Sequence, residues 1–179
     1  MNTLLIENPK AAAGCTAPRA ELDAATMAQL VADYATAKSR QDIDAALQVC
    51  DESFWLFTDA FNVTAKGQAQ VRMQLEYFFR AFPDYAVTLD GFGSNEYAYT
   101  CWGHLSMTLR GKFAGFAPTG KTARLPFVCV FTFKGQKLAS ERFFFCPEAL
   151  CEQLGISLPK YRRMISLASV LPVSLQTRF

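Results

Sequence analysis

The sequence predicts an α+β fold in which helices cover one face of a strongly curved, mixed β-sheet. Helix-spaced apolar residues dominate the N-terminal half of the chain. Two apolar runs of strand length, residues 125–133 and 138–145, follow, and the turn 134–137 separates them. A curved sheet that wraps around N-terminal helices leaves a cone-shaped cavity between its layers. We therefore expect a cone with an interior pocket.

Three helices are expected in the N-terminal half. Residues 23–40 form the first, because Asp23 can cap it and apolar residues recur at helical spacing. A short second helix begins at Asp42, and residues 67–82 form the third. A first strand covers residues 54–57. The apolar stripe of the first helix comprises Met27, Leu30, Val31 and Tyr34.

The C-terminal half is expected to be mostly strands. Residues 85–89 alternate like a strand, residues 91–95 read as a turn, and residues 96–110 are long enough for a bent strand. The two apolar runs, residues 125–133 and 138–145, follow and form a hairpin. Pro147 suits a first helical position, so residues 147–155 close as a short helix.

The 179 residues are most simply one domain with extended ends. Residues 1–22, rich in Ala, Pro and Gly, are expected to be a flexible arm. Residues 23–156 form the cone domain. Residues 157–179 are expected to be a tail that packs on the domain or on a partner.

Composition excludes several functions. The net charge of +2, with Lys and Arg scattered along the chain, argues against nucleic acid. No apolar stretch has the length of a membrane span, so we expect no membrane partner and a cytoplasmic protein. Six Cys without CxxC spacing and one His argue against a metal site. We expect reduced thiols and no cofactor.

Short motifs mark the expected elements in order. Phe82-Pro83-Asp84 precedes a strand, and Gly115-Phe116-Ala117-Pro118-Thr119-Gly120 precedes the hairpin. The others are Asp42-Ile43-Asp44-Ala45, Asp59, Gly67 with Val71, Glu141-Arg142 and Leu154-Gly155. With these motifs in this order, residues 24–156 resemble the SnoaL-like polyketide cyclases of the nuclear transport factor 2-like superfamily.

The resemblance implies a SnoaL-like, cystatin-like cone, often dimeric through its sheet, with a pocket for a small and often apolar organic molecule. Members cyclise polyketides by acid-base chemistry, and relatives isomerise steroids or open epoxides. This chain departs from the pattern at the expected acid and histidine. The acid positions late in the last strand hold Phe143 and Cys146, and the histidine position falls near Leu109. Neither Phe nor a neutral Cys can transfer a proton as a carboxylate does near pH 7.

Asp59 and His104 are the remaining candidates for catalysis. His104 is the only imidazole of the chain, which makes it the natural general base, although a lone strand histidine is more often structural. Asp59 follows the first strand, where the resemblance places the pocket rim; the alternative is a turn aspartate.

Six residues are candidates for ligand binding. The Tyr34 hydroxyl could reach a carbonyl oxygen in the cavity, and Trp102 shares a strand face with His104. In the last strand, one face carries the candidates Arg142, Phe144 and Cys146, and the other face carries Glu141, Phe143 and Phe145. The sequence leaves open which of these faces lines the cone. The candidates are Tyr34, Trp55, Trp102, Arg142, Phe144 and Cys146.

Two functions stay open from the sequence. One is a cofactor-independent cyclase, isomerase or hydrolase acting on an apolar, polyketide-like or steroid-like carbonyl compound. The other is a binding or accessory domain that kept the pocket and lost the acid. Long aromatic strands offer more apolar surface than one helical layer covers, so we also expect a homodimer.

Overall fold

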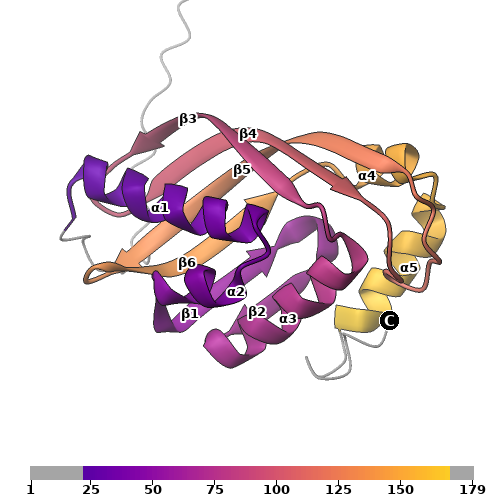
Figure 1. Ribbon diagram of the computed structural model, residues 1–179, viewed down its shortest axis with the longest axis horizontal. Coiled ribbons are helices and arrows are strands. Elements are labelled where there is room, and N and C mark those ends of the chain that lie inside the picture. Colours follow the sequence, from indigo (N-terminus) through magenta and orange to yellow (C-terminus); the bar gives the residue numbers. More distant parts are fainter. Residues whose placement is uncertain (1–21, 170–179) are drawn as a thin grey trace, which may run out of the picture.

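A six-stranded mixed sheet forms the body of the protein in the computed structural model, which describes residues 22–169 (Figure 1). The strand order is β2-β1-β6-β5-β4-β3. β1 runs parallel to β6, and all other neighbours are antiparallel. The strands are β1 (Cys50–Thr58), β2 (Val63–Lys66), β3 (Ala86–Ser94), β4 (Tyr99–Thr108), β5 (Thr122–Lys134) and β6 (Lys137–Phe144).

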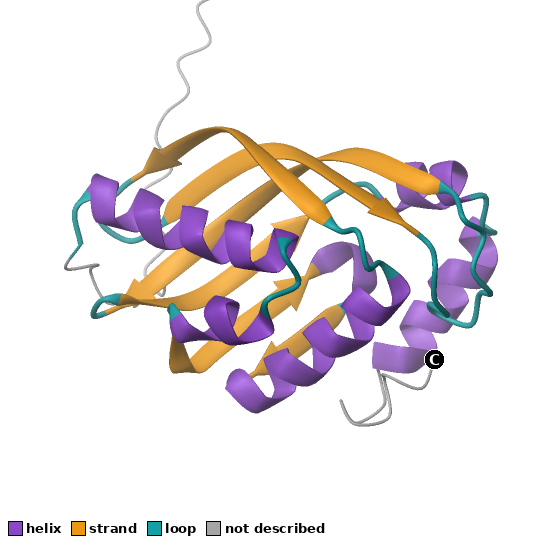
Figure 2. Cartoon of the chain, viewed as in Figure 1, coloured by secondary structure: helices purple, strands orange, loops and turns teal. Residues whose placement is uncertain are grey.

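The three N-terminal helices, α1 to α3, cover one face of the curved sheet (Figure 2). α1 contacts β3, β4 and β6, whereas α3 contacts β1 and β2. α4 and α5 lie together at the far end of the sheet from the start of α1 (Figure 1). The expected α+β fold, with N-terminal helices on a curved mixed sheet, is confirmed. The helices are α1 (Ala24–Ser39), α2 (Ile43–Gln48), α3 (Gln68–Ala81), α4 (Pro147–Leu154), α5 (Leu158–Ser169) and a 3₁₀ turn, η1 (Asp59–Phe61).

Local chemistry explains where the helices begin and end. The Asp23 and Asp42 side chains accept hydrogen bonds from backbone N–H groups in the first turns of α1 and α2. Pro147 occupies the first turn of α4, and Gly155 ends that helix with a φ of 68°. These signals are visible in the sequence, and the helices begin and end near the expected residues.

The structure adds elements that the sequence did not indicate. β3 continues to Ser94, through the residues expected to turn, because the register shifts between Leu89 and Gly91 and the strand passes over a bulge. The turn comes later, where the Asn95 side chain accepts two backbone hydrogen bonds. β2 and η1 were also not expected. β2 is short and depends on pairing with β1 rather than on its own pattern.

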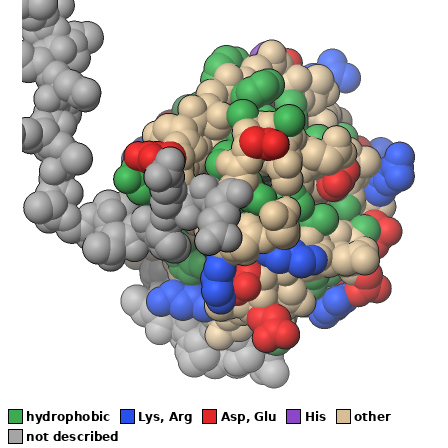
Figure 3. All heavy atoms as spheres, turned by 90° about the vertical axis from the view of Figure 1, so that its left-hand side faces the viewer, with side chains coloured by type: hydrophobic (Ala, Val, Ile, Leu, Met, Phe, Trp, Pro, Cys, Tyr) green, Lys and Arg blue, Asp and Glu red, His purple; other side chains and the backbone are tan. Residues whose placement is uncertain are grey.

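The two faces of the sheet differ in burial. Leu105, Phe127 and Phe143 point toward the helices and are almost fully buried. Trp102, on the same strand as Leu105, and Val128, on the same strand as Phe127, lie on the outer face and are exposed. Figure 3 shows the end at the left of Figure 1, where charges of both signs stand among hydrophobic side chains.

The ends of the chain are only partly described. The expected arm, residues 1–22, lies outside the described residues except for Leu22. The expected tail contains α5, and residues 170–179 lie outside the described part. Within residues 22–169, no helix is long and apolar enough to cross a membrane.

Candidate functional site

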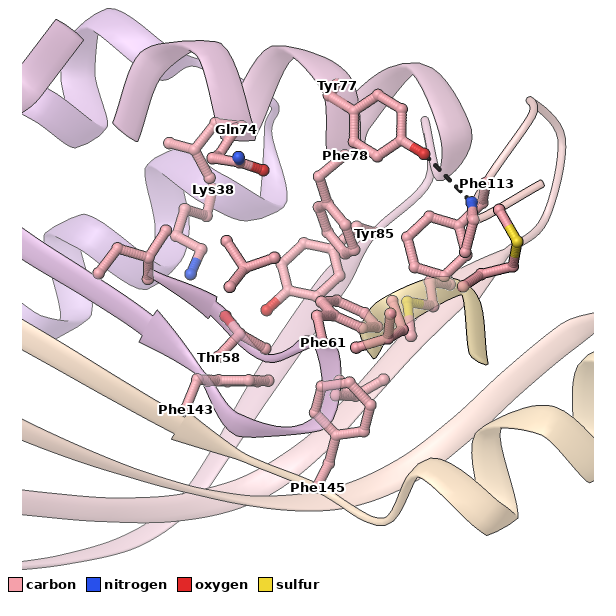
Figure 4. A pocket seen from close by; sticks show the side chains of 18 residues that line it. Lys38, Thr58, Phe61, Gln74, Tyr77, Phe78, Tyr85, Phe113, Phe143 and Phe145 are labelled. Atoms are coloured by element: carbon pink, nitrogen blue, oxygen red, sulfur yellow. Dashed lines mark hydrogen bonds between the residues drawn. The ribbon is translucent and has the colours of Figure 1, made fainter. Parts of the chain in front are cut away.

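An apolar cavity of about 90 Å³ lies between α3, the inner face of the sheet and α5 (Figure 4). Phe61 is at the centre of its aromatic wall, with ring centroids 5.1 Å from Phe113 and 5.2 Å from Phe145. Edge-to-face rings at this spacing make a stable, rigid apolar surface. The lining residues are Lys38, Leu56, Thr58, Phe61, Val63, Gln74, Leu75, Tyr77, Phe78, Tyr85, Leu105, Met107, Phe113, Ala114, Phe143, Phe145, Met164 and Ile165.

Lys38, at the polar end of this cavity, belongs to a buried ion pair. Lys38 Nζ, from the last turn of α1, donates to Glu141 Oε1 at 2.9 Å and to Oε2 at 3.1 Å. The Tyr34 hydroxyl donates to Glu141 Oε2 at 2.8 Å, and Cys129 Sγ lies 3.5 Å from Oε1. Glu141 is 1% exposed and Lys38 is 8% exposed. Such a pair is stable in the interior only because each charge has the other as its partner.

Burial and the charges of this cluster together set the protonation of its members. Burial acts to lower the pKa of Lys38, but the adjacent Glu141 carboxylate, together with Tyr85 and Cys129, raises that pKa above its ordinary value. Burial, reinforced by Glu141, raises the pKa of Tyr34. Burial likewise raises the pKa values of Tyr85 and Cys129. Near pH 7 Lys38 is therefore an ammonium, and the phenols and the thiol are neutral.

Lys38 keeps hydrogen-bonding capacity toward the cavity. An ammonium has three N–H donors, and Glu141 takes at most two of them. Figure 4 shows the Lys38 nitrogen and the hydroxyl groups of Thr58 and Tyr85 directed toward the same part of the cavity. This end can therefore bind an acceptor atom of a ligand, while the rest of the wall offers apolar contact.

A second, smaller cavity of about 20 Å³ lies between α1 and the sheet. Lys38, Tyr85 and Phe143 line both cavities, whereas Tyr34 and Glu141 line only the smaller one. Lys38, Tyr85 and Phe143 thus lie between the two spaces, and the Lys38 ammonium is the charged group that reaches the larger one.

The two catalytic candidates from the sequence lie apart and outside both cavities. His104 is on the outer face of β4, with a side chain 65% exposed and Nδ1 2.7 Å from Asp90 Oδ2. Asp59 is the exposed first residue of η1, and the preceding residue, Thr58, lines the larger cavity instead. β6 and β5 stand between β1 and β4 in the sheet, so the structure does not bring this pair together. Their catalytic role stays a prediction.

Most of the ligand-binding candidates also lie on the outer face. Trp102 is 46% exposed and covers Gly91, where an added Cβ would lie 2.4 Å from the indole ring. The Arg142 guanidinium lies 5.5 Å from the centre of the Phe144 ring. Of the six candidates only Tyr34 lines a described cavity. Trp55, Trp102, Arg142, Phe144 and Cys146 line neither.

Sequence reasoning missed the residues that make the polar end of the cavity. Lys38 continues the apolar stripe of α1, four residues after Tyr34, and that position is the signal that places it inward. Glu141 alternates with Phe143, so both side chains share the inner face. Nothing local indicates that the two charges meet, because they are 103 residues apart.

Metal binding has no support among residues 22–169. No group of three or more His, Cys, Asp or Glu side chains there could hold a metal ion. The described cysteines are free thiols.

Residues 28–154 match the family model described as SnoaL-like polyketide cyclase. The chain belongs to this family. Phe143, where members of the SnoaL-like family are expected to carry an acid, lines the larger cavity. No curated protein matches the sequence.

Solved structures share the fold at low sequence identity. A protein from Jannaschia sp. CCS1, proposed to be a SnoaL-like polyketide cyclase, is 16% identical, with a TM-score of 0.68 over 87% of this chain and 99% of its own. TsrD from Streptomyces laurentii is 18% identical, with a TM-score of 0.67 over 76% of this chain and 100% of its own.

A third protein, from Catenulispora acidiphila DSM 44928, has a ketosteroid isomerase-like fold and is in complex with trimethylamine. It is 13% identical, with a TM-score of 0.65 over 72% of this chain and 94% of its own. At such identities these structures establish the fold of the chain rather than its chemistry.

Proposed function

We propose that this SnoaL-like domain binds a small, neutral, apolar molecule that carries a carbonyl oxygen. The rings of the ligand occupy the aromatic cavity, and its oxygen accepts a hydrogen bond from Lys38. One observation carries this proposal: an ammonium with a remaining N–H donor reaches into a mostly apolar, aromatic cavity.

The charges favour a neutral ligand. Glu141 already balances Lys38, so an anionic ligand would add an unbalanced buried charge beside that carboxylate. A cationic ligand would be repelled by the ammonium. A carbonyl group satisfies the N–H donor without changing the charge of the interior.

Binding has more support than catalysis. A cyclase or isomerase of acid-base type needs a general base within reach of its substrate. Among the described side chains that line the larger cavity there is neither a carboxylate nor an imidazole. The related fold from Catenulispora acidiphila holds a small organic molecule, trimethylamine. A turnover assay tests the alternative that the protein is an enzyme.

Calorimetric titration with two matched probes tests this proposal. Acetophenone and ethylbenzene have similar shape, and only the first has a carbonyl oxygen. Because a hydrogen bond to a charged group contributes about 1.5 kcal/mol or more, the native protein should prefer the ketone by about tenfold. The paired variant Lys38→Met with Glu141→Gln removes the ammonium without leaving a lone buried charge, so it should lose this preference.

The outer-face residues supply the controls. His104→Ala and Asp59→Asn should leave both affinities within about twofold, since neither side chain lines the cavity. A native protein that binds both probes equally contradicts the proposal. So does a paired variant that keeps the preference for the ketone.

A further inference from the structure

α5 is an addition to the part of the chain that matches the family. The match ends at residue 154, and α5 spans Leu158–Ser169. The buried Tyr161 fastens this helix to the domain, since its hydroxyl donates to the carbonyl oxygen of Ala60 at 2.5 Å. Lys160 Nζ donates to the Gly115 carbonyl oxygen at 3.0 Å. The helix is thus anchored at η1 and at the loop before β5.

Two side chains of α5, Met164 and Ile165, complete the wall of the larger cavity. Met164 packs beside Gly115, where an added Cβ would lie 3.0 Å from its methyl group. Phe113, two residues before this glycine, lies across the cavity from Lys38 in Figure 4. Met164 therefore stands at the end opposite the ammonium.

The two α5 side chains are more exposed than the lining near Lys38, whereas Phe113 beside them is 4% exposed. Near Lys38 the lining is almost fully buried, with Tyr85 3% and Phe143 6% exposed. Met164 and Ile165 are half-buried. The cavity thus runs from a buried polar end to an apolar end near the protein surface, where α5 forms the boundary.

We propose that α5 is a selectivity cap and that Met164 and Ile165 set the length of the molecule that fits between them and Lys38. This inference rests on the proposed use of the cavity for ligand binding. A ligand whose oxygen contacts Lys38 extends toward α5, so each added ring must find space against these two side chains. Shortening them lengthens the cavity without touching its polar end.

Affinities for a one-ring and a two-ring ketone test the cap. In the double variant Met164→Ala with Ile165→Ala, the affinity for 2-acetonaphthone relative to acetophenone should rise about tenfold or more, because methylene groups in an apolar pocket have effects of this size. Met164→Trp fills the same space, so the ratio should fall. Leu167→Ala, at a 50% exposed position of the same helix, is the matched control and should leave the ratio unchanged.

The hydrocarbons ethylbenzene and 2-ethylnaphthalene separate this inference from the proposed function. If the ring-number ratio shifts for hydrocarbons as well as ketones while the ketone preference is missing, the cap stands and the role of Lys38 fails. If the ketone preference holds and the ratio is the same in all variants, the cap is overturned. Binding of no probe, or an equal shift in the Leu167→Ala control, also overturns it.

Discussion

At the residue scale, Lys38 and Glu141 depend on each other. Both are buried, and the Lys38 ammonium lies 2.9 Å from the nearest carboxylate oxygen. Removing the ammonium leaves Glu141 with hydrogen bonds from Tyr34 and Cys129 but without a balancing charge. The pair therefore serves the fold as well as the cavity.

We predict that Lys38→Met lowers the free energy of unfolding by about 3 kcal/mol, because it leaves a buried carboxylate unpaired. The paired variant Lys38→Met with Glu141→Gln should recover most of this loss, since the amide keeps an acceptor for Tyr34 and carries no charge. Urea denaturation measures the free energy of unfolding of the single and the paired variant. Equal destabilisation by the single and the paired variants would show that the charge is not the cause.

At the element scale, Asp84 ties the turn after α3 to the end of β4. Its Oδ1 accepts a hydrogen bond from the Thr108 backbone at 2.8 Å. Although burial raises the pKa of Asp84, the hydrogen bonds with Thr108 hold it below its ordinary value. The carboxylate is thus favoured in the folded state. Its contribution to stability is present above the ordinary pKa and is lost as pH falls through the folded-state pKa.

Asp84→Asn should therefore weaken the dependence of the free energy of unfolding on pH in the acid range. The side chain is 43% exposed, so solvent screening limits the effect to about 0.5 kcal/mol. Unfolding free energies at about pH 5 and pH 2 should differ less in the variant than in the native protein. An unchanged difference would mean that this hydrogen bond has no part in acid unfolding.

The elements also show how far the sequence predicts the structure. The pattern of apolar runs and turn residues predicts the strands within residues 96–145, and both faces of these strands carry apolar residues. It does not tell which face is inside, since Trp102 and Phe144 on the outer face are as apolar as Leu105 and Phe143 on the inner face. The inner face is decided by packing of α1 and α3 against the sheet, and this depends on contacts between distant segments.

At the scale of the whole molecule, the outer face of the sheet carries a row of apolar residues. Trp102 is the register partner of Val128, and Val128 is the register partner of Phe144. Trp102 and Val128 are 46% and 42% exposed. A contiguous apolar row across three strands is typical of a surface that another protein covers. The homodimer expected from the sequence would cover this row.

We predict that the native protein is a dimer in light scattering at micromolar concentration. Trp102→Glu with Val128→Lys should make it a monomer, because the charges would lose their hydration in the interface. Leu167→Lys, at an exposed position on α5, is the control and should remain dimeric. A monomeric native protein would contradict this prediction.

The central claim is that Lys38 binds the oxygen of an apolar ligand inside the aromatic cavity. A crystal structure of the native protein with acetophenone tests it most directly. The account predicts the ring against Phe61 and Phe143 and the carbonyl oxygen about 2.7–3.2 Å from Lys38 Nζ. A ketone bound elsewhere, or one in the cavity with its oxygen directed toward α5, would contradict the claim.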